Sequence, residues 1–112
     1  MEIVGIDAGG SLLKIAYVEH GRYRYKWFPI DEMDQALSWM KRLKPAARYR
    51  ITGGRAAKVK EKLTGADVTF IPEFDSVCIG TRELLVKEGK EPKSDFLIVS
   101  IGTGTSFFLM KG

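Results

Sequence analysis

The chain has 112 residues, 45% of them hydrophobic and 29% charged, which is the composition of one soluble globular domain. Its 18 lysines and arginines exceed its 14 aspartates and glutamates and give a net charge of +4, but they are dispersed and form no aromatic-interleaved motif of a nucleic-acid binder. No apolar run approaches the ~18 residues of a membrane span, and the single cysteine, Cys78, excludes an internal disulfide.

The first third of the chain predicts three antiparallel strands. Residues 3–7 are apolar, mostly β-branched and followed by glycines, and residues 13–19 predict a second strand. His20, Gly21 and Arg22 form the expected turn. Residues 23–30 then alternate aromatic with basic side chains, as a half-exposed strand does.

The remaining sequence predicts helices that alternate with strands. Asp31 is the expected N-cap of the first helix, whose apolar residues recur at helical spacing. A later helix carries its apolar residues on one face, including Phe74, Cys78 and Leu84. The expected elements are a helix that begins after Asp31 and is ended by Pro45, strand 49–52, basic helix 55–63, buried strand 68–71, helix 74–88, linker 90–94, strand 96–101, glycine turn 102–106 and strand 107–110.

This order predicts an α/β fold with a mixed sheet, in which three antiparallel strands precede the βα units and helices cover the sheet. The last hairpin repeats the plan of the first: an apolar strand, a turn of glycines and hydroxyls, and another apolar strand. We therefore expect a first domain over residues 1–89, a linker over 90–94 and the first β-hairpin of a second, truncated domain over 95–112.

The stretch DAGGSLLK, residues 7–14, has the residues of a phosphate site. Glycines let a backbone turn tightly and approach a ligand, and their N–H groups can donate to phosphate oxygens. Ser11 adds a hydroxyl, Lys14 a point charge suited to phosphate, and Asp7 a ligand for magnesium. A structural glycine turn with an incidental Asp and Lys is the alternative. The spacing matches neither a P-loop nor a dinucleotide fingerprint.

A second glycine turn, GTGTS at residues 102–106, follows an equally apolar strand. Alone it reads equally well as a plain hairpin turn. Paired with the first, it predicts two hairpins that clamp one polyphosphate from opposite sides. Its candidate ligand-binding residues are Gly102, Thr103, Gly104 and Ser106.

Two further positions could contact a substrate. Glu73 follows a strand and precedes a helix, where open α/β sheets gather ligand groups, so it could be a general base. Capping of that helix by Glu73 or Asp75 is the alternative, and the residues alone favour it. In TGGRAA, residues 52–57, the glycines could admit a substrate and Arg55 could contact an anion, although a tight strand-to-helix connection explains the motif as well.

In this order, the motifs GIDAGGSLLKIAY, ITGGRA, IPEFDSVCIG and IVSIGTGTSFF resemble the N-terminal part of type II pantothenate kinases, within the actin-like superfamily of sugar kinases and chaperone ATPases. The resemblance covers almost the whole chain. It implies a ribonuclease H-like, actin-like ATPase N-terminal domain. Ser11 departs mildly from the family, which has Thr there.

The resemblance also implies ATP-dependent phosphorylation of pantothenate, the first step of coenzyme A biosynthesis, with ATP and Mg²⁺ as cofactors. It assigns Mg²⁺ to Asp7 and the role of general base toward the pantothenate hydroxyl to Glu73. Thr103 and Ser106 would contact the phosphoryl group and substrate. ATP phosphates would be held by Gly9, Gly10, Ser11 and Lys14, with Gly102 and Gly104 in the second turn.

The main departure from the family is length. Family members continue into a second domain with most adenine contacts and a pantothenate-binding arginine. We therefore expect an N-terminal fragment that is inactive alone, resides in the cytoplasm, and forms a homodimer or pairs through its exposed C-terminal hairpin. The alternatives are an amino-sugar kinase of the same superfamily and a non-catalytic nucleotide-binding or assembly module.

Overall fold

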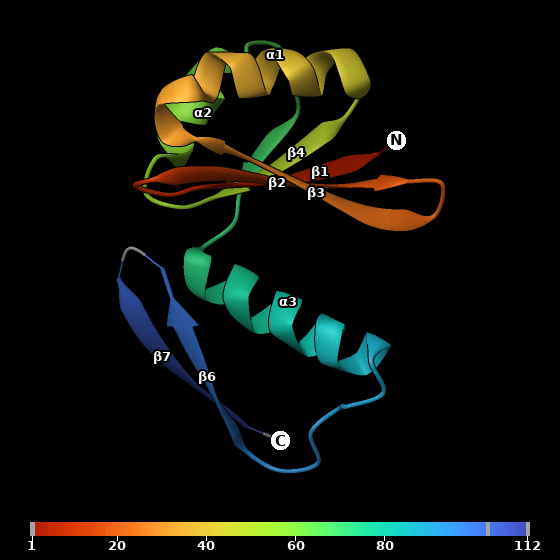
Figure 1. The fold of residues 1–112 in the computed structure, drawn as a ribbon, viewed down its shortest axis with the longest axis vertical. Coiled ribbons are helices and arrows are strands. Elements are labelled where there is room, and N and C mark those ends of the chain that lie inside the picture. The colour runs from red at the N-terminus through yellow and green to blue at the C-terminus, as the bar shows by residue number, and fades with distance from the viewer. Residues whose placement is uncertain (1, 103, 112) are drawn as a thin grey trace. The chain divides into compact units, whose positions relative to one another are not determined.

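The structure is a computed structural model that describes residues 2–102 and 104–111. The chain folds as two compact units, residues 1–71 and residues 72–112, which we call the sheet unit and the hairpin unit (Figure 1). No helix in the described residues has the length and apolar character needed to cross a membrane.

The sheet unit contains one five-stranded sheet in the order β3-β2-β1-β4-β5. Strands β1, β2 and β3 form an antiparallel meander, and β4 and β5 join it by parallel pairing, β4 next to β1. The prediction of a mixed sheet is therefore confirmed. The strands are β1 (Ile3–Ala8), β2 (Leu12–Glu19), β3 (Arg22–Pro29), β4 (Arg48–Thr52) and β5 (Val68–Phe70).

Two helices cover one face of this sheet, α1 (Met33–Leu43) and α2 (Ala56–Lys62) (Figure 1). The helices cover the face of the sheet to which β1 contributes its apolar side chains. Along β1, Val4, Ile6 and Ala8 are buried, while the residues between them are more exposed. The core residues from the other elements, all buried, are Leu13, Ile15, Met33, Ala36, Leu37, Met40, Ala47, Tyr49, Ile51, Ala56, Val59 and Leu63.

The start of α1 differs from its prediction. Asp31 is not an N-cap: it lies inside a 3₁₀ turn, η1 (Ile30–Glu32), and Glu32 precedes α1 without a side-chain capping hydrogen bond. The Ile30 N–H donates to the Ser11 carbonyl oxygen at 2.9 Å. This bond holds the end of β3 against the first glycine turn, and the 3₁₀ turn follows directly from it along the chain.

The turn between β2 and β3 agrees with its prediction. His20 and Gly21 both have positive φ, 52° and 75°, as the two central residues of a type I′ hairpin turn do. His20 is exposed and part of the turn, as the sequence predicts.

Strand β5 was predicted to be buried, and that prediction is wrong. It lies at the edge of the sheet, and Phe70 is 46% exposed. The Lys60 ammonium lies 5.1 Å from the centroid of the Phe70 ring and covers part of it.

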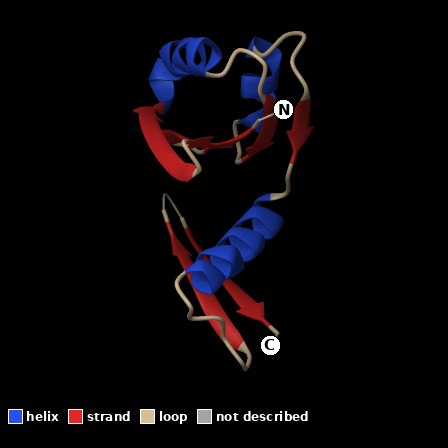
Figure 2. Ribbon diagram, turned by 90° about the vertical axis from the view of Figure 1, so that its right-hand side faces the viewer, coloured by secondary structure: helices blue, strands red, loops and turns tan. Residues whose placement is uncertain are grey.

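The hairpin unit consists of α3 (Glu73–Lys87) and the antiparallel pair β6 (Phe96–Ile101) and β7 (Thr105–Met110) (Figure 2). One face of the hairpin contacts α3 through Phe108, and Ile98 is buried. Cys78 is buried as predicted, whereas Phe74 and Leu84 remain more than half exposed although they were expected on the apolar face of the helix.

Candidate functional site

The turn between β1 and β2 places a carboxylate opposite an amine. Asp7 and Lys14 are directly paired in the antiparallel register, so their side chains share a face of the sheet, opposite the one covered by the helices. Asp7 is half-buried and Lys14 exposed. Within the described part of the chain neither residue forms an ion pair, so both charges are available to a ligand.

One of the backbone N–H groups of this turn already forms a hydrogen bond within the turn. The Gly9 N–H donates to the Leu12 carbonyl oxygen at 3.0 Å. Gly9 therefore shapes the turn in this structure, and its predicted bond to a phosphate would require that internal bond to open. Gly10 and Ser11, beside it, are exposed.

The end of β4 lies beside Asp7. The parallel register pairs Asp7 with Thr52, and the next residue, Gly53, has a φ of 100°. A Cβ at Gly53 would collide with the Ala8 carbonyl oxygen and lie 2.8 Å from Asp7 Oδ1. Only glycine fits here, both because of its φ and because the Asp7 carboxylate lies against it.

Arg55 is joined to the same corner by its backbone. Its N–H donates to the Ala8 carbonyl oxygen at 3.0 Å, and it is the residue that precedes α2. Its side chain is exposed. The backbone of Arg55 is therefore held against Ala8, the residue that follows Asp7 on β1. The anion contact by the Arg55 side chain remains a prediction.

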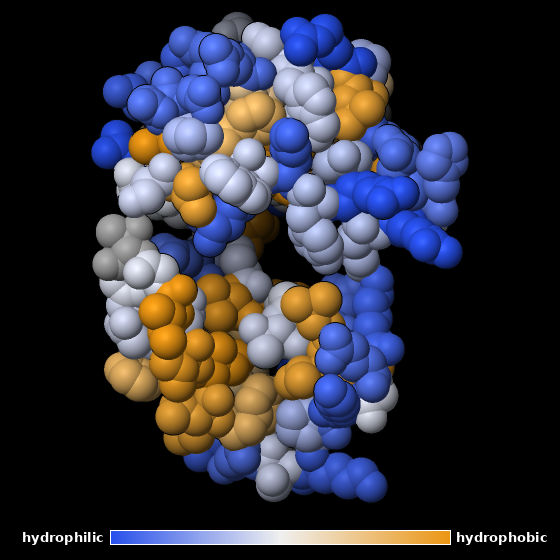
Figure 3. All heavy atoms as spheres, in the orientation of Figure 1, coloured by the Kyte–Doolittle hydropathy of each residue, from blue (hydrophilic) through white to orange (hydrophobic). Residues whose placement is uncertain are grey.

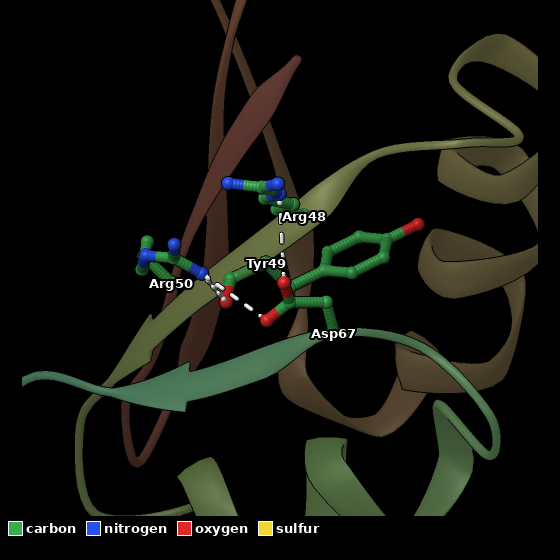
Figure 4. A network of polar contacts seen from close by, with 4 residues as sticks. All are labelled: Arg48, Tyr49, Arg50 and Asp67. Carbon is green, nitrogen blue, oxygen red and sulfur yellow. Dashed lines mark hydrogen bonds and ion pairs between the residues drawn. The ribbon is translucent and has the colours of Figure 1, made fainter. Parts of the chain in front are cut away.

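An acidic residue pairs with two arginines on the same sheet face. Asp67 lies between the side chains of Arg48 and Arg50, with nitrogen–oxygen distances of 3.5 and 3.6 Å (Figure 4). Arg50 also donates to the Tyr49 carbonyl oxygen at 3.2 Å. The ring of Tyr49 is buried, and this burial raises the pKa of its phenol. These contacts stiffen the β4–β5 edge that ends at Thr52.

Glu73 begins α3 in the hairpin unit and is exposed. It follows Pro72, and no side-chain capping hydrogen bond is formed at this helix end. Glu73 therefore does not cap α3 through a hydrogen bond, although an acid in the first turn still interacts favourably with the helix dipole.

In the hairpin unit, α3 begins near the end of the hairpin at which β6 ends and β7 starts (Figure 1). Phe74 packs on Phe108, with ring centroids 5.1 Å apart. Ser106 shares the face of β7 that carries Phe108, because the two residues are two positions apart. The Gly102 N–H donates to the Gly104 carbonyl oxygen at 2.8 Å. Thr103 lies outside the described residues.

The predicted residues thus fall into two groups, one in each unit. Asp7, Lys14 and the backbone of Arg55 meet in the sheet unit, and Glu73 and Ser106 share one end of the hairpin unit. No group of three metal-ligating side chains occurs in the described residues. Magnesium commonly uses one or two carboxylates together with water and substrate phosphates, so the single Asp7 carboxylate fits a nucleotide-borne ion.

Thr52 is the first residue of the TGGRAA motif, and the sequence predicts no role for it. Its hydroxyl is the one buried side-chain oxygen or nitrogen in the described residues that lacks a hydrogen-bond partner. Alternation along β4 could have identified it, since Tyr49 and Ile51 face the core and Thr52 follows Ile51. The partner strand, however, is not visible from the sequence.

No protein-family model matches the chain. In the structural comparison, two structures of the Aquifex aeolicus Ppx/GppA protein match the whole chain with TM-scores of 0.55 and 0.57, at 17% identity. The chain covers 48% and 49% of those structures. At this identity the likeness shows the fold, which is that of the actin-like ATPase domains.

Sequence comparison gives closer relatives. The chain is 49% identical over 108 residues to the type II pantothenate kinase of Oceanobacillus iheyensis, and it covers 40% of that protein. It is 36% identical over 105 residues to the enzyme of the same name from Bacillus cereus, and 31% identical over 109 residues to that of Staphylococcus saprophyticus. The chain is therefore homologous to type II pantothenate kinases over 96% of its own length, and it spans about 40% of theirs.

Proposed function

We propose that the chain is the phosphate-binding N-terminal part of a kinase that transfers the γ-phosphoryl group of ATP to the primary hydroxyl of pantothenate, in the cytoplasm, as the first step toward coenzyme A. The observation that carries the proposal is the convergence of Asp7, Lys14 and Gly53 at one corner of the sheet. The 49% identity to a type II pantothenate kinase supports the choice of reaction.

The sheet unit supplies the nucleotide contacts. Lys14 neutralises phosphate charge, and Asp7 holds the magnesium ion that accompanies ATP, which would neutralise charge on the phosphates. Gly9, Gly10 and Ser11 bring the turn close to the phosphate chain. Phosphoryl transfer depends mainly on such positioning and charge neutralisation.

The hairpin unit supplies the acceptor side. Glu73 takes the proton from the pantothenate hydroxyl, and Ser106, with Thr103, orients the phosphoryl group and substrate. Gly102 and Gly104 let the turn approach the phosphates. The packing of Phe74 on Phe108 supports this assignment, because it fixes the beginning of α3 against the strand that carries Ser106. Arg55 adds an anion contact for substrate.

The nucleotide half of the proposal is tested by calorimetric titration of the chain with ATP, in magnesium and in EDTA. We expect magnesium-dependent binding that Asp7→Asn weakens about tenfold, the scale of one charge-assisted contact. The matched control is Asp67→Asn, which changes a carboxylate on the same sheet face that pairs with two arginines. Equal binding by Asp7→Asn and the unaltered chain would contradict the assignment.

The catalytic half requires a complete enzyme. A chimera in which the chain replaces the matching segment of the Oceanobacillus iheyensis kinase is assayed for ADP release with pantothenate and, separately, with N-acetylglucosamine. We expect turnover with pantothenate only, negligible turnover by the 112-residue chain alone, and a loss of about 10²–10⁴ in kcat for Glu73→Gln. Asp75→Asn, in the same helical turn, is the control. Preference for the amino sugar would favour the alternative kinase.

We also propose that the chain self-associates through the hairpin. Leu97, Val99, Ile101, Phe107 and Leu109 lie on the face opposite Phe108 and are between 46% and 80% exposed. Figure 3 shows the apolar side chains gathered over β6 and β7. Soluble monomers rarely expose a continuous apolar face larger than a few hundred Å². A second copy of the same face would bury it, as in an isologous dimer.

A further inference from the structure

The hydroxyl of Thr52 has a property that the proposed nucleotide contacts leave unexplained. It is buried, and no described residue forms a hydrogen bond with it. A buried polar group without a partner costs about 1–3 kcal/mol, and such groups in folded proteins call for an explanation. Valine has nearly the same shape and favours strands at least as well, so a structural role alone does not account for a hydroxyl at this position.

Thr52 lies at the same corner of the sheet as Asp7. The two residues are register partners on adjacent parallel strands, so their side chains emerge side by side on one face. Asp7 Oδ1 lies against Gly53, the residue that follows Thr52. Thr52 and Asp7 are therefore neighbours on this face of the sheet, and the Thr52 hydroxyl has no hydrogen bond to the Asp7 carboxylate.

Thr52 is the uncharged polar side chain that β4 presents on this face of the sheet. Arg48 and Arg50, the other residues of β4 that face this way, pair with Asp67. Gly53 presents no side chain and cannot carry one without striking the Ala8 carbonyl oxygen. The register neighbour of Asp7 on β4 is thus an uncharged hydroxyl residue, whose oxygen can both accept and donate a hydrogen bond.

We propose that Thr52 is a positioning residue that binds a water molecule in the hydration shell of the magnesium ion held by Asp7. The inference rests on the proposed function, since it assumes that Asp7 holds the ion. Magnesium retains several waters when bound, and groups that hydrogen-bond to its ligands commonly alter affinity by 10–100-fold. In this arrangement the Thr52 hydroxyl accepts one hydrogen bond from the water and donates another to the Asp7 carboxylate. Both hydrogen-bonding functions of the hydroxyl are then satisfied.

The test compares Thr52→Val, Thr52→Ser and Thr69→Val. Thr69 is an exposed threonine of β5 that is paired with Arg50 on the same sheet face, so Thr69→Val controls for loss of a hydroxyl from this surface. ATP binding is titrated in magnesium and in EDTA, and thermal unfolding is followed without nucleotide. Manganese binding in the presence of ATP, read by electron paramagnetic resonance, reports the metal directly.

We expect Thr52→Val to weaken magnesium-dependent binding of ATP and binding of manganese about tenfold, with binding in EDTA unchanged. Without nucleotide it should melt at or above the temperature of the unaltered chain, because no internal hydrogen bond is lost. Thr52→Ser retains affinity and Thr69→Val has no effect.

Three results would overturn the inference. One is unchanged magnesium-dependent binding by Thr52→Val while Asp7→Asn binds weakly, which leaves the proposed function intact. Another is an equal loss in magnesium and EDTA, which indicates a direct phosphate contact. The third is a lower melting temperature of Thr52→Val without nucleotide, which indicates an internal hydrogen bond. If the unaltered chain shows no magnesium-dependent binding of ATP, the proposed function and the inference fail together.

Discussion

The ring of Phe74 in the first turn of α3 packs edge-on against the ring of Phe108 in β7, with centroids 5.1 Å apart and planes inclined at 70°. Aromatic pairs in this geometry contribute about 0.5–1.5 kcal/mol beyond their buried area. The pair joins the two parts of the hairpin unit at the end that carries Glu73 and Ser106.

Phe74→Ala should therefore loosen the hairpin unit. We expect amide hydrogen exchange in β7 to become about tenfold faster, because loss of the ring pair lowers the local stability by roughly 1–2 kcal/mol. Ile79→Ala is the control, since Ile79 lies on the same helix and is 65% exposed. Equal exchange in the two variants would show that the ring pair does not stabilise β7.

Gly53→Ala should destabilise the sheet unit by about 2 kcal/mol or more. A left-handed φ costs a residue with a Cβ roughly 1–2 kcal/mol, and contact with the Ala8 carbonyl oxygen and Asp7 adds to it. Urea unfolding followed by tryptophan fluorescence measures the loss, since Trp27 and Trp39 both belong to this unit. Gly54→Ala, with open space around its Cβ and no left-handed φ, should change stability by less than about 0.5 kcal/mol. Similar losses in both variants would contradict the argument.

Tyr49 should make the sheet unit less stable at alkaline pH. Its burial raises the pKa of the folded phenol, so above the ordinary tyrosine pKa of about 10 the unfolded chain loses this proton first. The unfolded state then binds fewer protons than the folded state, and stability falls as pH rises further, while below about pH 10 this contribution is complete. Urea midpoints measured from pH 8 upward should fall less steeply for Tyr49→Phe than for Tyr25→Phe, whose phenol is exposed. Parallel curves would disprove the effect.

Phe107→Lys should abolish self-association. The substitution places a charge in the centre of the apolar hairpin face, where its burial against a second copy would be unfavourable. We expect the unaltered chain to form dimers at micromolar concentration in equilibrium sedimentation and Phe107→Lys to remain monomeric. Thr105→Lys, at the margin of the same face, should retain the dimer. A monomeric unaltered chain would contradict the proposal.

The sequence was sufficient for most of the secondary structure. Alternation along β2 and helical spacing from Met33 to Leu43 depend on which side chains are buried, and that information is local. In β3 the aromatic residues Tyr23, Tyr25 and Trp27 are exposed, so their alternation with basic residues does not mark a buried face. Asp31 failed as a cap because the decisive contact, from the Ile30 N–H to the Ser11 carbonyl, joins residues 19 positions apart. The prediction that Phe70 is buried was wrong because a short apolar strand has the same sequence pattern at the edge of a sheet as in its centre.

The candidate site was predicted in its local parts only. DAGGSLLK predicts the juxtaposition of Asp7 and Lys14, since a short hairpin sets its own register. The sequence did not predict that Thr52 and Gly53, at the end of β4, lie beside Asp7. Asp7 and Thr52 are 45 residues apart, and the parallel register that pairs them depends on the packing of the intervening α1. The assignments of Glu73, Ser106 and the phosphate-binding glycines remain predictions that the chimera and the titrations test.

The pairing of β1 with β4 also matters for synthesis of the protein. The first glycine turn leaves the ribosome with the opening hairpin, but Thr52 and Gly53 follow only after α1 has emerged, and parallel pairing must close that long loop. A nascent chain that ends before Arg48 has Asp7 and Lys14 but lacks Gly53, the residue that lies against the Asp7 carboxylate. The corner formed by Asp7, Thr52 and Gly53 therefore closes only after residues 48–53 have been synthesised, which makes it a late product of folding.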